Sequence, residues 1–291
     1  MSKDNKKQDV GTTGHEWDGI EELNNPLPRW WVWIFYATIV WGIWYTIAYP
    51  AWPMLKEATS GYLGYSTRQN VADEIAAVEA QNAEILAKLE TTELAAIADD
   101  AELHQFAVNG GAAIFLANCS QCHGSGAAGA TGYPNLLDDD WIWGGTIEEI
   151  AYTVEHGIRN EQSPDARWTE MPAFGEILPK EEISAVVQHL LAISGQEHDA
   201  TQLALGEEVY LNNCAGCHGD AGEGIREMGA PQLNDAIWLY GGDEATLTET
   251  VMNARFGVMP AWGAEWQPAA GLTGAEVKAV SSYVHQLGGG E

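Results

Sequence analysis

Cysteine is scarce in this chain, with only four among 291 residues. All four fall in two short stretches, NCSQCHG at residues 118–124 and NCAGCHG at residues 213–219. Because no cysteine lies outside these stretches, the sequence argues against a disulfide-stabilised scaffold. A structural zinc site also uses Cys-x2-Cys pairs, but pairs 95 residues apart, each followed at once by histidine, fit such a site poorly.

Basic residues are also few, with 13 lysines and arginines against 42 acidic residues and a formal net charge of −29. Residues 101–291 hold 27 acidic and six basic residues, so the acidity continues through the half with both cysteine stretches. This charge excludes nucleic acid as a partner, because binding to phosphates requires the opposite sign. It would steer a partner with a basic face toward the chain, or it serves only to keep the protein soluble.

The sequence shows no convincing alternation of apolar and polar residues that would predict a strand. It also lacks the βαβ context that a thioredoxin-like Cys-x-x-Cys pair requires. Apolar residues recur instead at helical spacing in residues 147–156 and 182–193, and in the counterpart that contains Val277, Val280 and Val284. A further helix is expected at residues 111–118, and glycine-rich stretches such as GSGAAGATG at 124–132 read as loops. The predicted fold class is therefore all-α.

Both cysteine stretches have the spacing Cys-x-x-Cys-His, which is the signature of covalent c-type haem attachment. Each thiol adds to one vinyl group of the porphyrin, and the adjacent histidine lies beneath the iron as its proximal ligand. The sequence therefore predicts two covalently bound haem c groups. The predicted attachment and ligand residues are Cys119, Cys122 and His123 for the first haem and Cys214, Cys217 and His218 for the second.

The two stretches belong to a tandem repeat of about 85 to 95 residues. GAAIFLANCSQCHG at 111 matches GEEVYLNNCAGCHG at 206, and MPAFG at 171 matches MPAWG at 259. The first copy holds about nine extra residues before its Met-Pro pair, around RNEQSPDARWTE. The aromatic pairs Trp141 with Trp143 and Trp238 with Tyr240 occupy equivalent positions, where we expect them to pack against haem.

Met171 and Met259 are the predicted sixth ligands, because a methionine thioether opposite histidine is typical of electron-transfer cytochromes c. Each precedes a proline, which keeps the local backbone out of a helix. The rival ligands do not recur at matching repeat positions: His156, His189 and His285. Which methionine serves which haem stays open, since each could serve its own domain, or Met171 the second haem and Met259 the first. If histidine and methionine occupy both axial positions of each iron, no position is open to a substrate. The chain is therefore predicted to relay electrons and to have no active site of its own.

A single uncharged run stands out at residues 30–49, WWVWIFYATIVWGIWYTIAY. Twenty residues of helix span the ~30 Å hydrocarbon core of a bilayer, and Trp30, Trp33 and Trp52 would lie at its interfaces. The run starts late, is long for a signal peptide and lacks a small-x-small cleavage site, so we expect a permanent anchor.

The basic residues around the anchor predict its orientation. Lys3, Lys6, Lys7 and Arg29 precede it, while only Lys56 and Arg68 follow within twenty residues. The positive-inside bias places the N-terminus in the cytoplasm. The remainder would then lie in the periplasm of a bacterium, where c-type haem is attached.

The expected organisation is a cytoplasmic segment at residues 1–29, a transmembrane helix at 30–50, a periplasmic helical spacer at 51–105, and cytochrome c domains at 106–197 and 198–291. The spacer has a partial apolar stripe with helical spacing, formed by Val71, Ile75, Val78, Ile85, Leu86 and Leu89. It would lie on a surface, such as a partner subunit, or form a solvated linker.

These features together resemble the di-haem subunit III of cbb3-type cytochrome c oxidase, the CcoP or FixP family. The specific match is DGIEELNNPLPRWWVWIFY at 18–36, with YPAWP at 49–53 and GYLGYSTR at 61–68. Some members of that family have two anchors, whereas this chain shows one. The resemblance implies contacts near the membrane through Asp18, Asn25, Pro26 and Pro28.

The resemblance also implies a function and partners. The chain would accept electrons from a soluble donor cytochrome c or from a mono-haem cytochrome subunit. It would pass them to the catalytic haem-copper subunit, which reduces oxygen and pumps protons at the bacterial inner membrane. The alternatives are a di-haem peroxidase with one open haem, an anchored donor for another reductase such as nitric oxide reductase, and a gas-sensing module.

Overall fold

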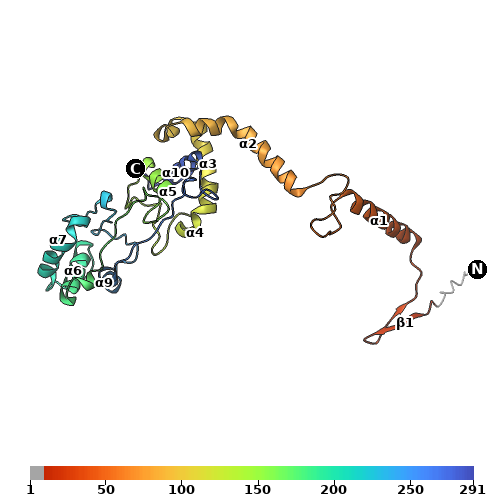
Figure 1. Cartoon of the computed structure of the whole chain (residues 1–291). Helices are drawn as coiled ribbons and strands as arrows, with labels where there is room; N and C mark the ends of the chain where they lie inside the picture. The colour runs from red at the N-terminus through yellow and green to blue at the C-terminus, as the bar shows by residue number, and fades with distance from the viewer. Residues whose placement is uncertain (1–9) are drawn as a thin grey trace, which may run out of the picture. The chain divides into compact units, whose positions relative to one another are not determined.

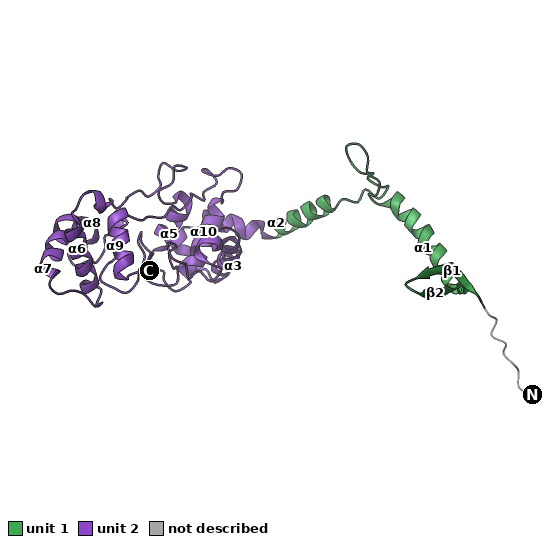
Figure 2. Cartoon of the chain, turned by 90° about the horizontal axis from the view of Figure 1, so that it is seen from below, with its two compact units in different colours: residues 1–81 green, residues 82–291 purple. Residues whose placement is uncertain are grey.

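The computed structural model describes residues 10–291 (Figure 1). The chain forms two compact units, residues 1–81 and residues 82–291, which Figure 2 colours separately. Lys3, Lys6 and Lys7, on which the predicted orientation depends, lie outside the described residues.

The first unit contains a short β-hairpin that the sequence analysis did not predict. Strands β1 (Thr12–Trp17) and β2 (Ile20–Leu23) pair antiparallel. Asp18 and Gly19 connect them with φ of 49° and 81°. Two-residue hairpin turns require positive φ and favour Asp-Gly, so the signal was present in the letters WDGI. The expectation that the chain has no strand was therefore wrong at this segment, although the fold class is confirmed as mostly helical.

The predicted anchor forms helix α1 (Arg29–Ala48), which begins directly after Pro28. It is long and apolar enough to cross a membrane, and its side chains are largely exposed, as expected for a surface that contacts lipid. The following loop returns to the end of α1, where Tyr62 and Leu63 donate backbone hydrogen bonds to the carbonyls of Ile47 and Ala48 (both 3.2 Å). These bonds satisfy carbonyls that the end of a helix leaves free.

Helix α2 (Thr67–Thr91) begins in the first unit and ends in the second, and a 3-10 helix, η1 (Leu94–Asp99), follows it. The C-terminal part of this predicted spacer belongs to the core of the second unit. Lys278 donates to the carbonyls of Glu90 and Thr92, both at 2.7 Å. Leu89, Ile97 and Leu103 are buried against Ala275 and Ala279. This part of the spacer is therefore not a solvated linker, because it packs on α10 of the same chain.

The second unit is built of helices and loops. Its helices are α3 (Ala101–Asn118), α4 (Ser120–His123), α5 (Ile147–His156), η2 (Phe174–Glu176), α6 (Lys180–Ile193), α7 (Leu203–Asn213), α8 (Ala215–His218), η3 (Arg226–Met228), α9 (Glu244–Asn253) and α10 (Gly274–His285). The predicted helices are present, although α3 begins ten residues before the expected 111. Capping boxes begin α5 and α10, where Thr146 pairs with Glu149 and Thr273 with Glu276.

The helices of the two repeats exchange partners. Helix α10, from the end of the second repeat, packs on α3 and α5 of the first. Helix α6, from the end of the first repeat, packs on α7 and α9 of the second. We call the group α3, α4, α5 and α10 the first lobe, and the group η2, α6, α7, α8 and α9 the second lobe; Figures 1 and 2 show each group together. The two tandem ranges describe sequence repeats, whereas each packed lobe takes helices from both.

Glycine permits the two equivalent crossings. A Cβ on Gly111 of α3 would lie 2.1 Å from the carbonyl oxygen of Ala279 on α10. A Cβ on Gly206 of α7 would lie 2.2 Å from the carbonyl oxygen of Ala185 on α6. Both distances are far shorter than a van der Waals contact, so any side chain would force the helices apart. Each repeat therefore contains the glycine that permits a close helix crossing as well as the Cys-x-x-Cys-His motif.

Candidate haem sites

Each Cys-x-x-Cys-His stretch forms a tight helical turn at the end of a longer helix. The backbone N–H of Cys119 donates to Phe115 at the end of α3, and α4 then carries Cys122 and His123. In the second repeat, Cys214 follows α7, and α8 carries Cys217 and His218. Glycine with positive φ ends both turns, at Gly124 (77°) and Gly219 (81°).

A cavity of about 500 Å³ opens beside the first motif. Cys119, Cys122 and His123 line one part of it, and Met259 with Pro260 lines another. The other walls are largely apolar and include Leu136, Trp141, Ile150, Val154, Val280 and Val284. A largely apolar cavity with a few ligating atoms is the form that cofactor sites take.

Both motif histidines are oriented by a second hydrogen bond. His123 Nδ1 lies 3.0 Å from the carbonyl oxygen of Pro134, and His218 Nδ1 lies 2.9 Å from that of Pro231. A carbonyl accepts, so Nδ1 carries the proton and donates, which leaves Nε2 with its lone pair free. Metal-bound histidines are held in this way by their other nitrogen. Burial also lowers the pKa of both imidazoles, which favours the neutral form that binds iron.

The cysteines do not resemble a thiol–disulfide active site. Burial raises the pKa of the Cys119 and Cys214 thiols to about 11, and the neighbouring cysteine of each motif adds to the increase. Redox-active Cys-x-x-Cys pairs instead have a thiolate stabilised by positive surroundings, with a pKa lowered toward neutrality. Neutral, partly buried thiols beside a large cavity fit covalent attachment better than thiol exchange.

Met259 is held at the first cavity by the first repeat. Ile158 and Met259 exchange two backbone hydrogen bonds, of 2.9 and 3.0 Å. The buried Asn160 side chain donates to the carbonyl of Met259 at 3.1 Å, and its Oδ1 accepts from the N–H groups of Gln162 and Ser163. These residues lie in the insertion that distinguishes the first repeat. The insertion therefore positions the methionine loop of the other repeat.

Met171 lies in the second lobe. It packs against the apolar core of that lobe, as Cys214, Leu233 and Trp238 also do, whereas Met259, Cys119 and Trp141 pack against the core of the first lobe. Met259 thus shares a cavity with Cys119 and His123 of the first repeat, and Met171 shares a lobe with Cys214 of the second.

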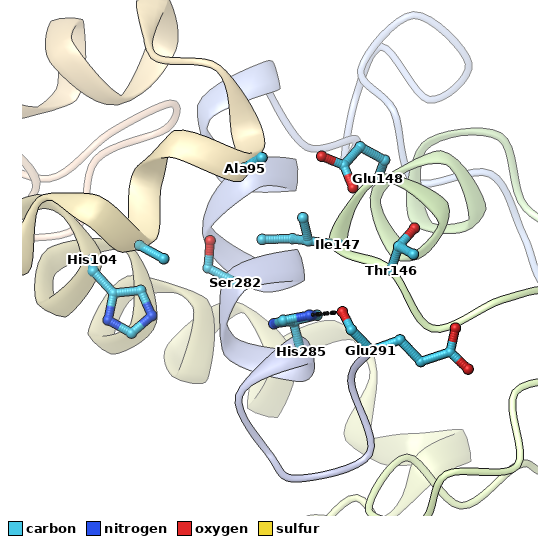
Figure 3. Close-up of a pocket in the computed structure, with 9 residues that line it drawn as sticks. Ala95, His104, Thr146, Ile147, Glu148, Ser282, His285 and Glu291 are labelled. Atoms are coloured by element: carbon cyan, nitrogen blue, oxygen red, sulfur yellow. Dashed lines mark hydrogen bonds between the residues drawn. The ribbon is translucent and has the colours of Figure 1, made fainter.

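The rival histidines lie elsewhere. None of them lines the cavity beside Cys119: His156 Nδ1 is 3.1 Å from Ser163 Oγ, and the His189 ring lies 5.0 Å from that of Tyr210. His285 Nε2 donates to the carbonyl of Glu291 at 2.9 Å, in a smaller cavity of about 270 Å³ between η1, α3, α5 and α10 (Figure 3). Among the described residues, no group of three His, Cys, Asp or Glu side chains is arranged to hold a metal ion.

The paired aromatics lie where haem would pack. Trp141 and Trp143 line the first cavity, and Trp141 Nε1 donates to the carbonyl of Gly289. Trp238 packs against the core of the second lobe, and its buried Nε1 has no hydrogen-bond partner within residues 10–291. A buried donor without a partner indicates a missing acceptor. Haem c carries carboxylates that would accept such a bond, so the residues present fit this group.

The sequence analysis did not identify Asn160 or Arg159, which lines the cavity. The only available signal was the nine-residue insertion, which could have been read as a segment with its own task. Its contacts with Met259 depend on a return of the chain some hundred residues later, so local patterns do not reveal them.

Comparisons with known proteins identify the family. Residues 9–56 match the family described as the N-terminal domain of cytochrome oxidase-cbb3, FixP. Residues 106–190 match cytochrome c oxidase, cbb3-type, subunit III, and residues 203–288 match cytochrome c.

Curated relatives cover nearly the whole chain. The cbb3-type cytochrome c oxidase subunit CcoP of Cereibacter sphaeroides is 57% identical over 296 residues, with 100% of both chains covered. The CcoP subunit of Rhodobacter capsulatus is 52% identical, with 99% of each chain covered. The FixP subunit of Sinorhizobium medicae is 49% identical, with 97% of this chain and 96% of that protein covered.

The cytochrome c domains imply haem c as the cofactor, and the apolar helix α1 indicates a membrane-anchored protein. The chain belongs to the CcoP/FixP family of cbb3-type cytochrome c oxidase subunits.

Proposed function

We propose that this chain is a membrane-anchored electron relay that carries two haem c groups. It accepts electrons from a donor cytochrome c, or from a mono-haem cytochrome subunit, and delivers them to the catalytic haem-copper subunit of a cbb3-type oxidase. The anchor lies in the bacterial inner membrane with both lobes in the periplasm, and the oxidase couples oxygen reduction to proton transport. Haem c, when bound, supplies a one-electron iron couple.

The residues of the chain have separate tasks in this proposal. Cys119 and Cys122 tether the first haem, and Cys214 and Cys217 tether the second. His123 and His218 present Nε2 to iron because the carbonyls of Pro134 and Pro231 hold their other nitrogen. Met259 closes the first site and Met171 the second, which leaves neither iron open to a substrate.

One observation carries the proposal: the cavity beside Cys119, Cys122 and His123 is also lined by Met259. A histidine and a thioether that meet in one apolar cavity favour electron transfer over gas binding or peroxidase chemistry. The apolar walls also exclude water. The family match supports the oxidase as the acceptor, because the relatives are named as its subunits.

The experiment is purification of the full chain from membranes, with analysis of thioether-bound haem and of copurified subunits. We expect two haem c groups per chain and a copper-containing partner. Carbon monoxide should not bind the reduced protein. Haem-free protein, an open iron at rest, or purification with a different reductase would contradict the proposal.

The ligand assignment has its own test in the full chain. With Cys119 and Cys122 changed to serine, only the second haem remains. We expect M171A to open that haem to carbon monoxide and M259A to leave it closed. The reciprocal chain, with Cys214 and Cys217 changed to serine, should respond to M259A alone. The opposite pattern would restore one methionine per sequence repeat. M228A is the control, since Met228 is exposed and has no counterpart in the repeat.

A further inference from the structure

Three arginines lie at the boundary between the two lobes of this acidic chain. Residues 101–291 contain only six basic residues, and Arg159, Arg167 and Arg255 are half of them. All three are partly buried. Such a concentration of the few cations in a partly desolvated region requires a physical reason, because burial of a guanidinium group is costly.

Their visible partners are neutral. Arg159 Nε donates to the carbonyl of Gly257 at 2.7 Å and Nη1 to that of Thr169 at 2.9 Å. Arg167 Nη1 donates to the carbonyl of Trp143 at 2.6 Å. The buried Nε of Arg167 has no partner among the atoms that the structure describes.

Arg255 follows the same pattern. Its Nη2 donates to the carbonyl of Thr246 at 2.8 Å, and its Nε donates to the hydroxyl of Thr250 at 2.9 Å. Its guanidinium lies 4.8 Å from the centre of the Tyr240 ring.

No carboxylate within 4 Å neutralises these three groups. The ion pairs within the described part of the chain are Lys88 with Asp100 and Arg226 with Glu291. Desolvation lowers the pKa of Arg159 and Arg167, and the charges of more distant groups such as Glu149 oppose this shift. A partly buried cation that no carboxylate pairs with in residues 10–291 leaves a place for an anion that completes the site.

The boundary relates the two repeats by an approximate two-fold arrangement. Trp143 and Tyr240 are equivalent in the repeats, and so are Gly132 and Gly229. Trp143 occupies the space beside Gly229, where a Cβ would lie 2.1 Å from its ring, and Tyr240 lies beside Gly132, where a Cβ would lie 3.2 Å from its ring. Each lobe thus inserts one aromatic ring against a glycine of the other, as in the self-complementary interface of a symmetric dimer.

This boundary also forms a wall of the first haem cavity. Arg159, Trp143 and Tyr240 all line the cavity that contains Cys119 and Met259. Arg167 lies over the Trp143 ring (5.5 Å), just as Arg255 lies over the equivalent Tyr240 ring. Arg167 and Arg255 each precede a candidate methionine ligand by four residues. The cations therefore repeat with the haem sites.

We propose that Arg159, Arg167 and Arg255 receive the propionate carboxylates of the haem groups at the lobe boundary, so that one cluster of cations serves both sites. This inference rests on the proposed function, because it requires haem in both lobes. Propionates supply the anions that the three guanidinium groups lack. Both haems then turn their carboxylate edges toward the boundary, while the cysteines Cys122 and Cys217 lie on exposed positions.

Shared cations have a measurable consequence. Oxidation adds a positive charge to an iron, and nearby guanidinium groups oppose it. Removal of one guanidinium should therefore favour the oxidised form of both haems and lower both midpoint potentials. We expect about a tenfold change in the ratio of oxidised to reduced haem at fixed ambient potential, which is about 59 mV for a one-electron couple.

The experiment is a redox titration of the full haem-loaded chain with R159Q, R167Q and R255Q, each compared with K180Q. Lys180 is an exposed cation at the start of α6, so K180Q removes the same formal charge without a contact to the boundary. The matching lysine variant, such as R159K, keeps the positive charge, so its midpoint potentials should lie close to those of the parent chain. It also serves where a glutamine variant fails to assemble.

The titration distinguishes a shared cluster of cations from separate contacts at each haem. Lower potentials at both haems, with recovery by lysine, support the shared cluster. A shift at one haem only, or shifts no larger than those of K180Q, would overturn it. Resonance Raman spectra give a second readout, because the propionate bending modes should shift in the arginine variants and not in K180Q. Two closed haems with unchanged potentials would refute this inference alone, whereas missing haem would refute the proposed function.

Discussion

Neighbouring glycines in α3 should respond to alanine in opposite directions. Gly110 and Gly111 occupy the same helix, but only Gly111 faces α10. A Cβ at Gly111 would lie 2.1 Å from the carbonyl oxygen and 2.6 Å from the carbonyl carbon of Ala279. A Cβ at Gly110 would meet nothing within 4 Å. The pair therefore isolates the crossing from the intrinsic preference of alanine for helix.

The magnitudes follow from two opposing effects. Alanine in a helix interior is favoured over glycine by about 1 kcal/mol. The contact at Gly111 is with backbone, so the helices must separate by about 1 Å, and such overpacking costs about 1–3 kcal/mol or more. We expect G111A to lower the free energy of unfolding by about 2 kcal/mol and G110A to raise it by about 0.5–1 kcal/mol.

Thermal unfolding of the haem-loaded chain measures both changes. For domains of 150–250 residues, each kcal/mol moves the midpoint by about 2–4 °C. G111A should thus unfold about 4–8 °C below the parent chain, and G110A slightly above it. Equal behaviour of the two variants would refute the close crossing of α3 and α10, and with it the exchange of helices between the repeats.

Two further predictions concern the methionine loop and an acidic residue of the cavity. We expect N160A to lower the free energy of unfolding by about 2–3 kcal/mol and to weaken the methionine–iron(III) charge-transfer band of one haem, because buried groups around Met259 lose their partners; exposed N253A is the control, and an unchanged band would contradict the role of the insertion. Desolvation, with repulsion from neighbouring aspartates, raises the pKa of Asp140 to about 6. This raised pKa means that the contribution of Asp140 to stability is complete below about pH 4 and is lost as the pH rises through about 6, so D140N should be more stable than the parent chain at pH 7 by about 1 kcal/mol after allowance for solvent screening. Chemical unfolding between pH 4 and pH 8 measures this slope, which D220N should retain, because Asp220 is exposed and is not among the groups that raise the pKa of Asp140; a D140N chain with the parent's slope would show that the carboxyl titrates normally.

Several elements were readable from letters alone because their causes are local. Residues 147–156 have an amphipathic period, a threonine cap and a glutamate three residues later, and they form α5 with the expected bounds. The anchor was predicted from a run of twenty uncharged residues, and the structure forms helix α1 there. The hairpin at β1 and β2 was equally local, with its Asp-Gly turn, but its strands are short and polar and lack the alternation that marks a buried strand.

Other features could not be read because their causes lie far apart in the sequence. Val71 and Leu89 belong to one apolar stripe of α2, yet Val71 is exposed and Leu89 is buried beneath α10. The spacing of the stripe is the same at both ends, so only the position of a distant helix distinguishes them. The same holds for Asn160, a polar residue in a loop whose burial depends on Met259.

The order of residues along the chain determined the chemistry of this protein: two Cys-x-x-Cys-His motifs, two Met-Pro pairs, one anchor and the helices between them. Covalent attachment and ligation depend on residue types and short spacings, which any reader of the sequence can count. Tertiary structure decided how these parts combine. The two repeats differ in sequence but offer equivalent glycine crossings at Gly111 and Gly206, so local contacts alone do not decide whether α10 packs on α3 or on α7. The bond from Asn160 to Met259 joins residues about a hundred positions apart and holds the methionine loop in the first lobe, and the packing of α10 on α3 and α5 places that helix there.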